Sequence, residues 1–143
     1  MMEIKRAVLS NIREIEAIEK ENFSDAWNAK MIEEELNSLS SAVFVALGED
    51  KLVKSYIILH FVLDEAEILR IATQNASKNK GYAEALLSYA AEELKKVRVK
   101  AIFLEVKHDN VSAKRLYEKH GFKKIATRAG YYNGEDGDIY KSE

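Results

Sequence analysis

The chain has 143 residues, of which 47% are hydrophobic and 32% are charged, and its formal net charge is −2. This length suits one domain with one core, and the composition is that of a globular protein rather than a disordered one. The absence of cysteine excludes disulfides, thiolate metal ligands and a cysteine nucleophile, and the three histidines are too scattered to indicate a metal site. No apolar stretch approaches the about 20 residues of a membrane span, and the first ten residues lack a signal-peptide core. We therefore expect a cytoplasmic protein with no membrane partner.

Apolar periodicity predicts one α/β domain over residues 1–143 with the element order βααβββαβαββ. The predicted strands are residues 3–9, 42–47, 52–62, 65–74, 100–106, 122–128 and 137–142, and the predicted helices are residues 11–23, 28–38, 80–97 and 110–120. Ser10 is expected to cap the first helix, and Gly121 to end the last one. Hairpins in the first half and a βαβ crossover in the second predict a mixed, mostly antiparallel central sheet flanked by helices.

The charge is distributed unevenly along the chain. Residues 1–74 contain 14 acidic and 8 basic residues, a net of −6, whereas residues 75–128 contain 6 acidic and 13 basic residues, a net of +7. One interpretation is that helix surfaces are simply charged. The other is a bipolar protein, with a basic half for a phosphorylated ligand and an acidic half for a cationic substrate. The total charge gives no reason to expect direct nucleic-acid binding.

The stretch "SKNKGYAEALL", residues 77–87, lies between a predicted strand and a predicted helix. A strand, a short basic loop with a glycine and a helix form a common phosphate-binding arrangement, because backbone N–H groups at a helix N-terminus bind anions. Lys78 and Lys80 would add positive charge. The alternative is an ordinary solvated loop with two surface lysines.

Three stretches carry a resemblance to a known family. Residues 78–83, "KNKGYA", stand in register with the pattern Gln/Arg-x-x-Gly-x-Gly/Ala; residues 104–125, "LEVKHDNVSAKRLYEKHGFKKI", contain an Asn and a Leu-Tyr-Glu-Lys-x-Gly-Phe segment; and residues 131–140, "YYNGEDGDIY", are rich in tyrosine. With the element order, these resemble the GNAT superfamily of acetyl-CoA-dependent N-acetyltransferases, in particular its RimI-like branch, which acetylates protein N-termini.

The sequence departs from the family pattern at a few positions. Asn79, at the second position of this stretch, stands where a further loop glycine is expected, Lys78 where arginine is usual, Ser55 replaces a small glycine and Ala26 a proline. Asparagine tolerates the left-handed backbone region better than most residues. We therefore expect these departures to affect cofactor affinity rather than the fold.

The resemblance implies acetyl-CoA as co-substrate, no metal, and a role for each matching residue. Glu105 would be the general base, acting through a water, and Tyr117 the general acid that protonates the departing thiolate. Tyr131 would contact the substrate. The implied cofactor contacts are the backbone of Ile71, Ala72 and Thr73, the phosphate loop Lys78, Asn79, Lys80, Gly81, Tyr82 and Ala83, and Asn110.

Each role has a structural alternative. Strand alternation could point Glu105 outward as a surface acid, and Tyr117 could be a packing tyrosine on an amphipathic helix. Asn110 could be a plain helix N-cap, and the tyrosines around Tyr131 could serve packing.

Three functions remain open from the sequence. The first, which is the one we predict, is acetylation of a protein or peptide N-terminus, such as that of a ribosomal protein, by direct attack of the amine with no covalent enzyme intermediate. The second is acetylation of a small amine, and the third is a degenerate domain that serves only as an interaction module. The sequence leaves the oligomeric state, monomer or dimer, undecided.

Overall fold

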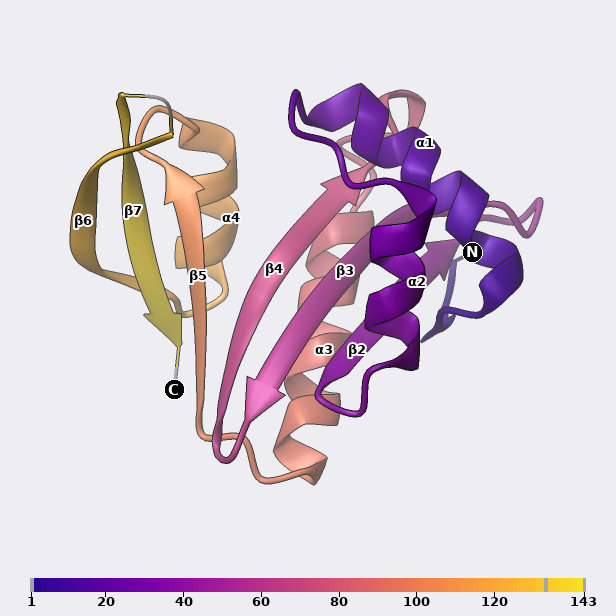
Figure 1. Cartoon of the computed structure of the whole chain (residues 1–143), viewed down its shortest axis with the longest axis horizontal. Helices are drawn as coiled ribbons and strands as arrows, with labels where there is room; N and C mark the ends of the chain where they lie inside the picture. Colours follow the sequence, from indigo (N-terminus) through magenta and orange to yellow (C-terminus); the bar gives the residue numbers. More distant parts are fainter. Residues whose placement is uncertain (1, 133, 143) are drawn as a thin grey trace.

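The computed structural model describes residues 2–132 and 134–142, which form a seven-stranded sheet with four α-helices around it (Figure 1). The strands are β1 (Glu3–Arg6), β2 (Ser41–Leu47), β3 (Val53–Val62), β4 (Glu65–Thr73), β5 (Ala101–Lys107), β6 (Lys123–Tyr132) and β7 (Glu135–Ser142). The helices are α1 (Ile12–Asn22), α2 (Ala29–Asn37), α3 (Tyr82–Lys96) and α4 (Val111–Lys119). The predicted element order is confirmed. In the described part of the chain, none of the helices is long and apolar enough to cross a membrane.

The strands lie in the spatial order β1-β2-β3-β4-β5-β7-β6. The first four are joined in sequence as antiparallel neighbours, while β4 and β5 are parallel and connected through α3. The C-terminal hairpin then reverses its order, so that β7 pairs with β5 and β6 becomes the edge. The sheet is therefore mixed and mostly antiparallel, as the sequence predicts.

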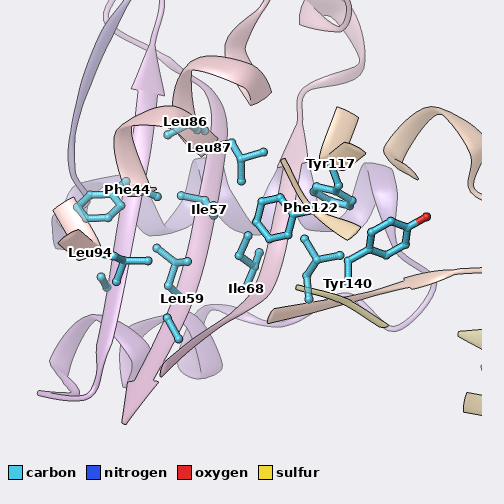
Figure 2. Packing of buried hydrophobic residues seen from close by; sticks show 14 of the residues in the cluster. Phe44, Ile57, Leu59, Ile68, Leu86, Leu87, Leu94, Tyr117, Phe122 and Tyr140 are labelled. Atoms are coloured by element: carbon cyan, nitrogen blue, oxygen red, sulfur yellow. The ribbon is translucent and has the colours of Figure 1, made fainter. Parts of the chain in front are cut away.

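Two apolar clusters cover the two faces of the sheet. On one face, Leu86, Leu87 and Leu94 of α3 form one cluster with Ile57 and Leu59 of β3, and Tyr117 of α4 belongs to the same cluster (Figure 2). On the other, the isoleucines of α1 and Ile32 of α2 pack against Tyr56 and Ile58. Alternate residues of β3 thus pack in the clusters on opposite faces of the sheet, because successive strand side chains point in opposite directions. Strands β2 and β3 are buried on both faces for this reason.

The start of α1 differs from the prediction that Ser10 caps it. A 3-10 turn, Leu9–Asn11, precedes the helix, and Asn11 is the residue at the N-cap position. The side chain of Asn11 turns back to accept a hydrogen bond from Val8 N–H at 2.9 Å. Ser10 lies inside this turn, where its hydroxyl is one residue too early to cap α1.

Candidate active site

The sheet divides between β4 and β5. The two strands pair in parallel over residues 65–68 and 101–104, and within the described residues the pairing stops there. Beyond this point they diverge toward the upper end of Figure 1, while β5 continues to pair with β7 as far as Lys107. A register shift against β3 leaves Leu69 as an extra residue in β4, which is a β-bulge that bends the strand. In the described residues, the backbone of β4 beyond Ile68 and that of β5 beyond Leu104 are therefore not paired with each other; we call this interruption of the sheet, next to the predicted contacts Ile71, Ala72 and Thr73, the opening.

The phosphate-loop candidate follows β4 directly. Asn79 has φ 63° and Gly81 has φ 88°, so both residues adopt the left-handed conformation. Ala85 N–H donates to Gly81 C=O at 3.1 Å as the first hydrogen bond of α3, which leaves the preceding amides of Tyr82, Ala83 and Glu84 directed ahead of the helix. Asn79 thus adopts the left-handed backbone conformation that asparagine was expected to tolerate.

The charges of this loop agree with an anion site. Lys78, Asn79 and Lys80 are all exposed and reach solvent just before the helix N-terminus. A helix N-terminus with free amide hydrogens and nearby ammonium groups suits the pyrophosphate of a nucleotide-type cofactor. The residues present therefore fit the group that the resemblance implies.

Side chains from two other elements hold the end of β4 in place. The buried Ser55 hydroxyl of β3 donates to Ala72 C=O at 2.8 Å and shares a 2.9 Å hydrogen bond with the hydroxyl of Thr73. From α1, Asn22 donates to Thr73 C=O at 3.1 Å, and Glu21 accepts from Asn75 N–H at 3.0 Å. The serine that replaces a glycine here is thus accommodated by hydrogen bonds to β4.

Glu105 lies on β5, one residue beyond the last pair with β4. Its side chain is 14% exposed, and its Oε1 lies 3.5 Å from a guanidinium nitrogen of Arg128 on β6. Burial raises the pKa of Glu105; the positive charge of Arg128 opposes this rise and the negative charge of Glu67 adds to it. The surface-acid alternative does not describe this environment. A partly buried carboxylate with a raised pKa at the edge of an opening suits a general base.

Tyr117 is held by the end of α4. Gly121, with φ 87°, donates to Glu118 C=O at 3.2 Å, and Phe122 N–H donates to Tyr117 C=O at 3.0 Å. This is a Schellman motif, in which the residue after the glycine packs on the residue at the start of the last turn. The rings of Tyr117 and Phe122 are accordingly 5.9 Å apart, edge to face (Figure 2). The segment "LYEKHGF" therefore fixes the tyrosine, which is only 6% exposed.

Glu105 and Tyr117 belong to opposite faces of the sheet. Leu104 and Val106 pack in the same cluster as Tyr117, on the α3–α4 face. Because strand side chains alternate, Glu105 between them points to the face of α1 and α2. The side chains of Glu105 and Tyr117 therefore lie on opposite faces of the sheet.

The remaining predicted site residues have the following surroundings. Asn110 caps α4, accepting a hydrogen bond from Ala113 N–H at 3.3 Å, as its structural alternative predicts. The side chain of Tyr131 lies outside the described parts of the structure. Among the described residues, no three His, Asp or Glu side chains come together in a way that could hold a metal ion.

A buried polar network on the α1–α2 face was not predicted from the sequence. Glu19 of α1 is completely buried and pairs with Arg70 of β4 at 2.7 Å, while the Tyr56 hydroxyl donates to its second oxygen. A signal existed: Glu19 stands four residues after Ile15 on the apolar stripe of α1, and Arg70 interrupts the apolar run "ILRIA". Two opposite charges at core positions indicate a buried pair.

Comparison with known proteins identifies the family. The sequence profile of the acetyltransferase (GNAT) family matches residues 12–122, and the chain belongs to this family. A protein of Bacillus subtilis, provisionally named a ribosomal protein bS18-alanine N-acetyltransferase, is 30% identical over 144 residues, covering 96% of this chain and 95% of its own.

Two further proteins share sequence or fold. The ribosomal protein bS18-alanine N-acetyltransferase of Escherichia coli is 35% identical over 91 residues, which are 64% of this chain and 62% of the relative's length. A crystal structure of the S18-alanine enzyme from E. coli superposes with a TM-score of 0.91 at 28% identity, covering 99% of this chain and 93% of the other. Arabidopsis thaliana NAA60, solved with acetyl-CoA, shares the fold with a TM-score of 0.87 at 16% identity, covering 99% and 97%.

Proposed function

We propose that this protein transfers the acetyl group of acetyl-CoA to a free amine, and that the amine is the N-terminal α-amine of a protein such as a ribosomal protein. One observation carries the proposal: the sheet opens beside a phosphate-type loop, with Glu105 on one face of β5 and Tyr117 on the other. The names of the E. coli and B. subtilis relatives support the choice of acceptor. Such acceptors are made in the cytoplasm, where we place the reaction.

The chain's own groups divide the chemistry between them. Acetyl-CoA supplies the activated acetyl group as a thioester. Amides at the start of α3, with Lys78 and Lys80, would bind its pyrophosphate, and N–H groups of β4 near Ile71 would stabilise the negative charge on the thioester oxygen during attack. Asn110, at the start of α4, would face the pantetheine.

Proton transfer falls to the two side chains beside the opening. Glu105, through a water, would take a proton from the substrate ammonium on the α1–α2 face, which leaves a neutral amine to attack the thioester, and Tyr117 would give a proton to the departing thiolate on the α3–α4 face. An α-amine titrates near ~7.7–8.0 and a lysine side chain near ~10.4, so a carboxylate base has the easier task at an N-terminus. Tyr131 remains our candidate for a substrate contact.

Two measurements, made one after the other, test the proposed function. Calorimetric titration with acetyl-CoA should show binding with about micromolar affinity, equivalent to about 8 kcal/mol. Mass spectrometry should then show acetylation of peptides with a free N-terminus, whereas the same peptides with a blocked N-terminus and an internal lysine should stay unmodified. Acetylation of spermidine or free amino acids in place of the peptides would favour a small-amine enzyme. No acetyl-CoA binding would favour an interaction module.

A further inference from the structure

The connection between α1 and α2, residues 23–28, lies beside the end of β4, where β4 and β5 part (Figure 1). Arg70 of β4 contacts this connection. Its guanidinium carbon is 3.8 Å from the centroid of the Phe23 ring and 5.5 Å from that of Trp27, and one of its nitrogens is 3.5 Å from a carboxylate oxygen of Asp25. A single β4 side chain therefore touches three residues of the connection.

Glu19 completes the arrangement from inside the protein. Its Oε1 accepts hydrogen bonds from Arg70 at 2.7 Å and from Trp27 N–H at 2.8 Å, and its Oε2 accepts from the Tyr56 hydroxyl. Glu19 is completely buried, and the Arg70 side chain is 12% exposed. Burying two charges is costly, so their retention in an otherwise apolar cluster indicates that their geometry matters.

Arg70 lies on the same face of the sheet as Glu105, which relates the Arg70–Glu19 pair to the proposed active site. Arg70 is opposite Ile58 in the β3–β4 ladder, and Ile58 packs in the cluster of α1 and α2. Glu105 points to this same face, on the other side of the opening. The connection held by Arg70 therefore lies on the face to which Glu105 points, across the opening from it, and Arg128 of β6 contacts Glu105 at 3.5 Å.

We propose that the Arg70–Glu19 pair is a positioning device that fixes residues 23–28 as a wall of the acceptor site, so that Arg70 sets acceptor affinity without taking part in proton transfer. This inference rests on the proposed function. The guanidinium suits the task because it stacks on an aromatic ring while its planar fork binds a carboxylate, which a lysine ammonium cannot do.

The test uses the full chain with Glu19→Gln, Arg70→Lys, Arg70→Met and the double variant Glu19→Gln/Arg70→Met. Removing Arg70 alone leaves a buried carboxylate without its ion pair and could unfold the protein, whereas the double variant removes both charges and keeps an acceptor for Tyr56. Arg13→Gln, an exposed arginine on α1, is the matched control.

Three readouts separate positioning from a general loss of structure. Hydrogen–deuterium exchange of the amides of residues 23–28 should speed up by about tenfold or more in the double variant, because local opening becomes less costly. Acetyl-CoA affinity should stay within about twofold of the parent. The KM for an N-terminal peptide should rise about tenfold with kcat within about threefold, the pattern of lost acceptor binding. Arg70→Lys should lie between parent and double variant.

The outcomes are distinct. Unchanged exchange in residues 23–28, or an unchanged peptide KM, in a folded double variant would overturn the inference, as would an equal loss of acetyl-CoA affinity. If the parent protein acetylates no peptide, the proposed function fails, yet the exchange measurement still decides whether the pair fixes the connection.

Discussion

The two sides of the opening between β4 and β5 present different kinds of chemical group. On the β4 side, the candidate contacts are backbone amides of the strand end, the loop at Asn79 and Gly81, and the first turn of α3. On the β5 side, they are two side chains, Glu105 and Tyr117, each held by its own packing. The sequence can therefore vary more on the β4 side, because a site made of backbone groups needs only the right backbone conformation. A site made of side chains, as on the β5 side, needs particular side-chain atoms.

The departures from the family pattern agree with this distinction. Asn79 and Ser55 both lie on the β4 side, and the local structure accommodates both. Asn79 adopts a left-handed backbone conformation, and Ser55 makes two hydrogen bonds to β4. On the β5 side, Glu105 and Tyr117 match the pattern without change. We therefore expect substitutions of Glu105 and Tyr117 to lower activity more than substitutions in the phosphate loop do.

The largest effect is expected for Glu105→Gln. The amide keeps the shape of the side chain but cannot accept the proton, so kcat should fall by about 10²–10⁴-fold. The raised pKa of Glu105 means that the parent enzyme loses its base as pH falls through that raised value; the acidic limb of kcat should therefore vanish in the variant. Steady-state kinetics across pH 5–9 measures both, with the exposed Glu92→Gln as control. A loss below about threefold would remove Glu105 from the base role.

Tyr117→Phe should be nearly as damaging to turnover. It removes the proton donor, for an expected fall in kcat of about 10²-fold, and it keeps the ring that packs against Phe122 in the Schellman motif. Thermal or urea unfolding should show a free energy of unfolding within about 1 kcal/mol of the parent, since the change removes only the hydroxyl and keeps the packed ring. Full activity in the variant would mean that Tyr117 serves packing alone.

Gly81→Ala tests the backbone side of the comparison. A Cβ would meet nothing within 4 Å, so the change acts through the φ of 88° alone. Alanine in that region costs about 1–2 kcal/mol, and if the loop changes shape to avoid it, acetyl-CoA should bind about tenfold more weakly.

The matched control is Gly130→Ala, which introduces the same kind of strain, at φ 67° with open space around it, in β6. It should lower stability by a similar amount and leave acetyl-CoA affinity unchanged. If calorimetry shows equal loss of affinity in both variants, the phosphate loop has no special part in binding.

Glu67→Gln should have a smaller effect. Glu67 is exposed on β4, and its negative charge contributes to the raised pKa of Glu105. Without it, that pKa falls and more of Glu105 is ionised in mild acid, so kcat on the acidic side of the profile should rise. Exposed charge pairs are worth at most about 1 kcal/mol, which limits the rise to about fivefold. A fall in kcat at acidic pH would show that Glu67 acts in some other way.

Asn79→Gly should have the smallest effect. The loop already has the left-handed backbone at this position, so glycine removes a modest strain but frees the unfolded chain. Acetyl-CoA affinity by calorimetry should stay within about threefold of the parent. A tenfold gain would mean that the asparagine side chain obstructs the cofactor, and the backbone account of this loop would be wrong.

The order of the strands and helices followed from the sequence by itself, and the sequence also supplied the candidates for the site residues. Periodicity placed every strand and helix to within a few residues, because alternation and helical stripes are local properties of the chain. It also located Gly121 at the end of α4, since a left-handed position there favours glycine. The basic loop before a helix was a local signal of the same kind, whereas the roles of Glu105 and Tyr117 came from the resemblance to the GNAT superfamily.

Tertiary structure alone decided how these parts meet. The β4–β5 pairing ends after Ile68 and Leu104, directly before the bulge at Leu69, while β5 continues to pair with β7, and this arrangement creates the opening. The Arg70–Glu19 pair joins residues 51 positions apart, and its geometry came only with the packing of α1 on the sheet. Such contacts form between segments distant in sequence, so no local pattern specifies their distance or direction.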